Sequence, residues 1–281
     1  FMVVMAALQK TRLISNVKSA MVSLVNKGSY RSYGLLLVIV MLGASLAGTG
    51  ATGYYVLILS LVSTIPYSKK LPTSKLMMPL GFATNHPLLP INLALLFGVT
   101  ATVLETAGFH QEISMGRFAL VNLIMSAAFL AWSLIAYRFL PDHPIADASE
   151  DALAGTGFTA MVGDAVAGVL GSGVSPFVFI VAFALLTSTC ATFTGSNMGS
   201  VYIFAPIAIA ACTSLGLNPT AAAIAVVISG WNGGYMPIDG MPAMILGMGK
   251  YKLPEFWVFS VPMYLIRILA LCAGAVFIFP M

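Results

Sequence analysis

The chain has 281 residues, of which 59% are hydrophobic and 8% are charged, with a formal net charge of +4. This composition excludes an ordinary soluble domain and predicts an all-α integral membrane protein, because the apolar runs have helical lengths and lack the alternation of barrel strands. The basic residues stand between the apolar runs, which indicates the cytoplasmic loops of a multi-pass protein, as in a bacterial inner membrane, and not a nucleic-acid surface.

The first half of the chain, residues 1–141, is interpreted as one repeat. Its longest apolar run exceeds the ~20 residues of one span and has a centre of small and polar residues from Gly48 to Gly53. Such a run predicts a re-entrant hairpin of two half-length helices. In chain order we expect a surface helix over 10–31, this hairpin over 33–66, a broken helix over 76–107 and a span over 118–140.

The second half, residues 158–281, predicts the same series around the turn Thr194 to Gly199. A turn at mid-membrane leaves backbone groups unpaired unless it is buried in protein or lines a polar cavity. We therefore expect a second re-entrant hairpin whose tip lies at a transport site. In chain order the predicted elements are a surface helix over 158–170, the hairpin over 175–213, a broken helix over 220–248 and a span over 256–280.

The two halves match at a fixed offset. A shift of 147 residues without gaps places Gly48 on Gly195 and Asn85 on Asn232. Interrupted segments at corresponding positions of two halves are typical of secondary transporters, whose sites lie between the repeats.

Charge predicts the orientation. The segments 10–31 and 67–75, together with Arg138, carry nine basic residues, whereas 108–117 carries one. The first set is therefore expected to be cytoplasmic. If each predicted span crosses the membrane once, Lys250 and Lys252, which follow the second broken helix, lie on the extracellular side. One further crossing between the halves would place them in the cytoplasm and would make the two repeats inverted. We therefore expect 142–157 to be a junction from which an odd number of spans is missing, and upstream sequence to be missing as well.

The hairpin tips and broken helices supply the candidate site residues. Helix N-termini suit an anion, and unwound carbonyls suit Na⁺. The candidates for substrate binding are Thr49, Gly50, Thr52, Gly195, Ser196, Asn197, Met198 and Pro237. The candidates for cation binding are Thr49, Asn85, Asn92, Asn197, Asn232 and Asp239. The alternative is that the glycines only allow close packing and the asparagines only cap helices.

Two charged residues inside apolar segments need separate explanations. A carboxylate at membrane depth costs about 2.5 kcal/mol or more, so Asp239 is expected to bind the coupling cation, carry a proton or cap a broken helix. Arg267 lies within the last span, where a scaffold or snorkelling role competes with pairing to an acid or binding an anion. His86 stands in a loop-like interruption, and the three cysteines are read as buried hydrophobes without a metal role.

A series of short motifs runs through the second half: Ser196-Asn-Met198, Ala205-Pro206, Leu215-Gly-Leu-Asn-Pro219, Met236-Pro-Ile238 and Met241-Pro242. In this order they resemble the second repeat of the divalent-anion:sodium symporters, in the ion transporter superfamily. There a Ser-Asn-Thr hairpin tip precedes a proline and a broken helix with a proline-rich turn. In the first half, Pro72 to Leu80 resembles the first repeat's broken helix, and Arg138 to Asp142 the segment after it.

The resemblance implies an inverted repeat of eleven spans, a homodimer, and elevator-type transport of dicarboxylates, citrate or sulfate with Na⁺. The chain departs from the family pattern at several positions. Met198 stands where threonine is expected, the first tip reads Thr49-Gly-Ala51 without an asparagine, and Asp239 replaces a small residue. These departures make H⁺ an alternative to Na⁺ as the coupling ion.

The sequence thus predicts a secondary transporter of a small anion, coupled to Na⁺ or H⁺, and no enzyme. In this hypothesis Ser196 and Asn197 bind substrate and cation, Thr49 mirrors them, and Asp239 binds the coupling ion. One alternative is a cation/proton antiporter of the same superfamily, which Asp239 favours. A second is an uncoupled channel. No catalytic residues are predicted, because the spans contain no Ser/His/Asp set or HExxH motif.

Overall fold

The structure is a computed structural model that describes residues 12–65, 69–110, 112–143, 175–238 and 240–281. All regular elements in these ranges are α-helices, which confirms the all-α prediction for this part of the chain. Five of these helices are long and apolar enough to cross a membrane, as a multi-pass membrane protein requires. The predicted surface helix over 158–170 and the junction beyond His143 lie outside the described residues.

The first half contains a helical hairpin, a broken helix and a long span. In chain order its elements are α2 (Arg12–Lys27), α3 (Tyr30–Ala47), α4 (Thr52–Ser63), α5 (Thr73–Ala83), α6 (Ala94–Thr106) and α7 (Met115–Ala136). The turn between α3 and α4 contains Gly48 and Gly50, whose φ angles of +91° and +77° are favourable only for glycine. Pro87 and Pro90 stand in the interruption between α5 and α6.

The second half repeats this order of elements. Its helices are α9 (Pro176–Thr194), α10 (Asn197–Ser214), α11 (Thr220–Ser229), α12 (Gly240–Gly249) and α13 (Leu253–Ile278). At the turn between α9 and α10, Gly195 adopts the left-handed conformation, and Ser196 caps α10 by accepting a hydrogen bond from the Gly199 N–H. The interruption between α11 and α12 contains Gly233 and Gly234.

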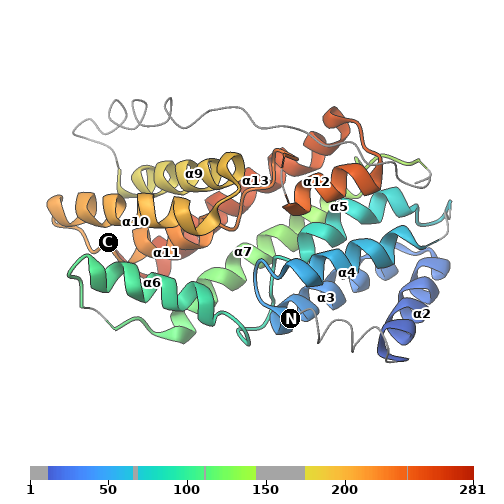
Figure 1. Cartoon of the computed structure of the whole chain (residues 1–281), viewed down its shortest axis with the longest axis horizontal. Coiled ribbons are helices and arrows are strands. Elements are labelled where there is room, and N and C mark those ends of the chain that lie inside the picture. Colours follow the sequence, from blue (N-terminus) through green and yellow to red (C-terminus); the bar gives the residue numbers. More distant parts are fainter. Residues whose placement is uncertain (1–11, 66–68, 111, 144–174, 239) are drawn as a thin grey trace.

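The helices form two lobes placed end to end along the long axis, with α7 and α13 packed together and contributing to both (Figure 1). The first lobe consists of α2, α3, α4 and α5 with α12, and the second lobe of α9, α10 and α11 with α6. Each lobe therefore holds the hairpin and the first half-helix from one half of the sequence, and the second half-helix from the other half. The lobes differ from the sequence halves by this exchange of α6 and α12.

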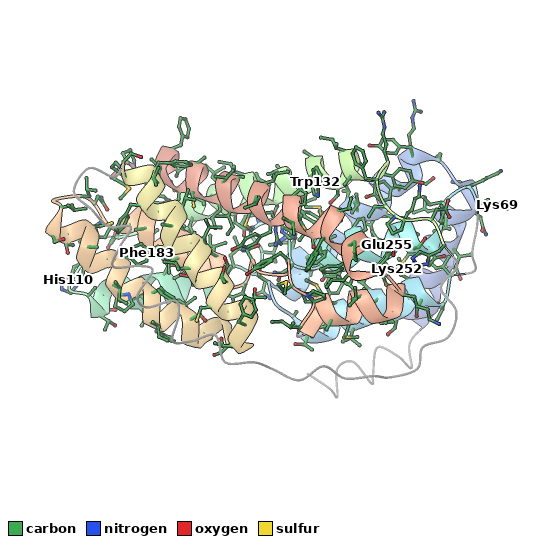
Figure 2. The ribbon with its side chains drawn as sticks, turned by 90° about the horizontal axis from the view of Figure 1, so that it is seen from above. Lys69, His110, Trp132, Phe183, Lys252 and Glu255 are labelled. Atoms are coloured by element: carbon green, nitrogen blue, oxygen red, sulfur yellow. The ribbon has the colours of Figure 1, made fainter. Side chains whose placement is uncertain are left out.

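The two hairpins lie at opposite ends of the molecule, and their turns meet in the middle (Figure 1). Figure 2 shows Lys69 and Lys252 toward one end and His110 at the other. Tyr251 fixes this placement, because its buried hydroxyl donates a hydrogen bond to the Ser74 carbonyl at the start of α5. Burial raises the pKa of Tyr251, so its hydroxyl stays a neutral donor. The lysines after the second broken helix thus lie toward the same end as those before the first, and the predicted orientation and missing spans stay predictions.

Candidate functional site

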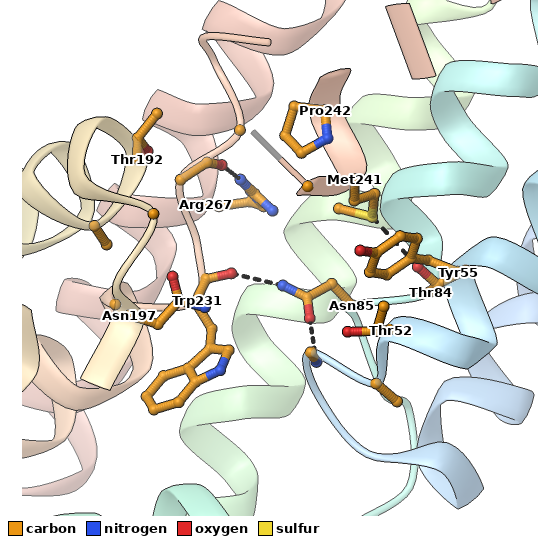
Figure 3. Close-up of a pocket in the computed structure, with 18 residues that line it drawn as sticks. Thr52, Tyr55, Thr84, Asn85, Thr192, Asn197, Trp231, Met241, Pro242 and Arg267 are labelled. Carbon is orange, nitrogen blue, oxygen red and sulfur yellow. Dashed lines mark hydrogen bonds between the residues drawn. The ribbon is translucent and has the colours of Figure 1, made fainter. Parts of the chain in front are cut away.

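A cavity of about 270 Å³ lies where the two lobes meet. Its wall draws on both hairpin turns, both broken helices and α13, as the close-up in Figure 3 shows. The described lining residues are Gly50, Ala51, Thr52, Tyr55, Thr84, Asn85, Ala191, Thr192, Gly195, Asn197, Gly230, Trp231, Gly233, Gly234, Gly240, Met241, Pro242 and Arg267. Most of this wall is backbone, hydroxyl or amide, so the cavity suits a polar ligand.

Helix ends of both polarities point at the cavity. The N-termini of α4, α10 and α12 supply lining residues, and so do the C-terminal ends of α5, α9 and α11. An N-terminus presents N–H groups and a partial positive charge, whereas a C-terminus presents carbonyls. The N-cap of α4, Ala51, makes no side-chain cap bond. The cavity therefore offers donors to an anion on some walls and acceptors to a cation on others.

The first halves of the two broken helices, α5 and α11, lie in the protein interior and lead into the polar turns at the cavity. All ten residues of α11 are buried, and in α5 only Lys75 is not. A helix that is apolar on every side belongs in a core, where its position is fixed by packing. Because α5 and α11 both end at the cavity, the residues that follow them are rigidly placed there.

Asn85, directly after α5, joins the two halves of the chain. Its Oδ1 accepts a hydrogen bond of 2.7 Å from the Gly50 N–H, and its Nδ2 donates one of 2.6 Å to the Trp231 carbonyl. The amide thus connects a hairpin turn of the first half with the broken helix of the second (Figure 3). A Cβ on Gly50 would lie 2.8 Å from Cδ1 of Trp231, so the contact requires glycine.

Arg267 of α13 is the only charged side chain among the described lining residues, and it is 1% exposed. Its Nη2 donates to the carbonyls of Asn232 at 3.0 Å and Gly233 at 2.6 Å, and its Nη1 lies 3.0 Å from Nε2 of His86. Its Nε is buried without a hydrogen-bond partner. The guanidinium thus carries a full positive charge into the wall of the cavity.

The contacts of His86 define its tautomer. A guanidinium only donates, so Nε2 of His86 accepts the bond from Arg267. Nδ1 then carries the proton and donates to the Phe82 carbonyl at 2.7 Å. The ring is fully buried and stacked on Phe129, with centroids 4.0 Å apart. His86 is therefore a neutral residue that positions the guanidinium, and its loop-like sequence gives no sign of this burial.

The cavity brings together five of the predicted site residues: Gly50, Thr52, Asn85, Gly195 and Asn197. Three others at the hairpin turns do not line it. Ser196 caps α10, Met198 is 37% exposed, and the Thr49 hydroxyl is buried without a partner. Their proposed contacts with a ligand stay predictions.

Among the predicted site residues of the broken helices, Asn85 lines the cavity and the others that the structure describes do not. Asn92 is exposed and its Nδ2 donates to the Leu46 carbonyl, so it fastens the turn after α3 and does not face the cavity. Asn232 is fully buried, and it reaches the site through its carbonyl, which accepts from Arg267. Pro237 is not among the lining residues, and Asp239 lies outside the described residues.

Several lining residues were not singled out from the sequence. The polar or aromatic ones are Tyr55, Thr84, Thr192 and Trp231. Their residue types are common in apolar helices, so no local signal marked them. Arg267 carried a signal, as the only charged residue of the last predicted span, 256–280, but a scaffold role was favoured. In the described ranges, no three His, Cys, Asp or Glu side chains are grouped to hold a metal ion.

Comparisons with known proteins add no assignment. No protein-family model matches the chain. No curated protein and no solved structure matches it either. The functional argument therefore rests on the geometry of the cavity.

Proposed function

We propose that this chain carries the substrate site of a secondary active transporter that moves a small anion across the membrane, coupled to Na⁺ or H⁺. The observation that carries the proposal is the cavity at the meeting point of two hairpin turns and two broken helices. Discontinuous helices whose ends face a mid-membrane cavity are the typical device of such transporters. The buried guanidinium of Arg267 and the N-termini of α4, α10 and α12 favour an anion as the cargo.

In this proposal the two halves form an inverted repeat, with the long axis of the molecule along the membrane normal. The placement of the hairpins at opposite ends supports this orientation (Figure 1). The length of α13 supports it as well, since its 26 residues extend about 39 Å against a hydrocarbon core of about 30 Å. The end that carries Lys69 and Lys252 is then cytoplasmic.

The mechanism that fits this architecture is an elevator motion, in which the lobes and their cavity move as one unit past a fixed partner. The exchange of α6 and α12 between the lobes supports a unit that moves as a whole, because neither lobe is complete without the other. A second copy of the chain, as in the dimers of the symporters it resembles, is the proposed fixed partner, and lipid covers the exposed apolar faces.

The direct test is uptake of labelled succinate, citrate and sulfate into proteoliposomes that contain the full-length protein. A Na⁺ gradient and a pH gradient are imposed separately, and Asn197→Ala serves as the site variant because Asn197 lines the cavity. We expect uphill uptake of at least one anion with one of the gradients, and its loss in Asn197→Ala.

Other outcomes separate the alternatives. Exchange of Na⁺ for H⁺ without movement of any anion, abolished by Asp239→Asn, would replace the proposal with a cation/proton antiporter. Steady downhill flux that neither gradient can drive uphill would indicate a channel. The buried positive charge of Arg267 is the structural reason for placing the anion transporter first.

A further inference from the structure

The charge of Arg267 has no negative partner among the residues that the structure describes. Its hydrogen-bond partners there are two backbone carbonyls and the neutral imidazole of His86. These dipoles solvate the guanidinium but leave its net charge in place. An uncompensated charge at this depth is costly, and an anion in the cavity would remove that cost.

The guanidinium also has an unused donor. Nη1 and Nη2 make the three bonds given above, while Nε is buried without a partner. A buried donor that lacks an acceptor costs about 1–3 kcal/mol. Because Nε is itself buried, an oxyanion in the cavity would act on the guanidinium through its negative charge.

The hydrogen bonds to His86 and to the two backbone carbonyls hold the guanidinium in place. His86 accepts from Nη1 and is itself fixed by the Phe82 carbonyl and by stacking on Phe129. The Nη2 bonds attach the same group to the interruption after α11. A charge positioned in this way needs no rearrangement when a ligand arrives, which lowers the cost of binding.

We propose that Arg267 is a resident cation of the transport site, so that the cavity binds its small oxyanion without a co-bound sodium ion. This inference rests on the proposed function. A site without a fixed charge must bring a cation into the membrane with each anion, whereas here the neutralising charge is part of the protein. The cavity of about 270 Å³, just below the roughly 300–1,000 Å³ of drug-sized pockets, has room for an oxyanion of a few carbon atoms or an inorganic oxyanion.

The test measures binding of succinate and sulfate to the full chain in detergent, with either choline or sodium as the added cation at equal ionic strength. The readouts are the anion-dependent shift in unfolding temperature and the fluorescence of Trp231, which lines the cavity. We expect the same anion to bind in choline and in sodium, with apparent Kd values within about threefold of each other.

Three variants locate the effect. Arg267→Gln should weaken binding in choline by at least about 30-fold, as expected for loss of a buried charged partner. Arg267→Lys keeps the charge without the forked donors and should retain part of the binding. The matched control is Arg117→Gln, because Arg117, in the first turn of α7, packs over Phe279 after α13 and does not line the cavity.

The outcomes are distinct. Binding in sodium and none in choline would overturn the inference and leave the proposed anion transporter intact. Wild-type affinity in a folded Arg267→Gln would also overturn it. Absence of anion binding with both cations would contradict the proposed function itself. If Arg267→Gln does not fold, the comparison of choline with sodium on the wild-type chain still decides the inference.

Discussion

At the scale of single residues, the cavity depends on a few amide and guanidinium contacts between distant parts of the chain. Asn85 and Trp231 are 146 residues apart in the sequence, yet their hydrogen bond joins the two halves of the chain beside the cavity. Arg267 and His86 are 181 residues apart and form the second such contact. Each pair combines one residue from each half, so the site exists only when both halves are folded together.

We predict that Asn85→Ala destabilises the protein by about 1–3 kcal/mol, because it leaves the Gly50 N–H and the Trp231 carbonyl without their partner. Anion binding should weaken as well, since the hairpin turn loses its attachment. Thermal unfolding in detergent and succinate binding measure the two effects. Asn92→Ala is the control, because Asn92 is exposed and makes a single bond of 3.2 Å. Equal effects of the two substitutions would contradict the bridging role of Asn85.

At the scale of elements, the turn between α3 and α4 is shaped by backbone conformation. Gly50 has a φ of +77°, and a Cβ there would meet the Trp231 ring. The turn can therefore approach the broken helix only because the side chain is missing. The same turn presents the N-terminus of α4 to the cavity.

We predict that Gly50→Ala costs about 1–2 kcal/mol from the left-handed backbone alone, and more from displacement of Trp231. Gly98→Ala provides a matched control within α6, where an added Cβ meets nothing within 4 Å. That control should be neutral or stabilising by about 0.5–1 kcal/mol, because alanine loses less entropy than glycine in a helix. Thermal unfolding in one detergent compares them. A Gly50→Ala protein as stable as Gly98→Ala would contradict the close approach of the turn.

At the scale of the whole molecule, lysines from both halves lie toward the same end. Lys69, from the first half, lies at the end opposite His110, and Lys252, from the second half, lies further inward in the same half of the molecule (Figure 2). All three side chains are exposed. If the long axis crosses the membrane, these ends face different compartments.

We predict that single cysteines report these faces. Cys190, Cys212 and Cys272 are first replaced by alanine, and Lys69→Cys, Lys252→Cys and His110→Cys are introduced one at a time. A membrane-impermeant maleimide added to intact cells should label only His110→Cys, because the basic end is cytoplasmic. Labelling of Lys252→Cys from outside, with Lys69→Cys protected, would contradict the inverted arrangement.

The sequence by itself determined the helical membrane class and the places where helices begin and end. Length of apolar runs, glycine and proline interruptions, and charge between runs are local properties, and α5 and α11 begin within a few residues of the predicted broken helices. The fixed offset between the halves is also visible without a structure, since it compares the chain only with itself.

Only the tertiary structure decided which candidates face the cavity. Asn85 and Asn92 are the same residue type in the same interruption, yet one lines the cavity and the other is exposed beside α3. The sequence favoured a scaffold role for Arg267, and only the structure shows that its side chain lines the cavity and contacts His86, Asn232 and Gly233. The physical reason is that the partners of these side chains lie 34 to 181 residues away in the sequence, where local patterns carry no information.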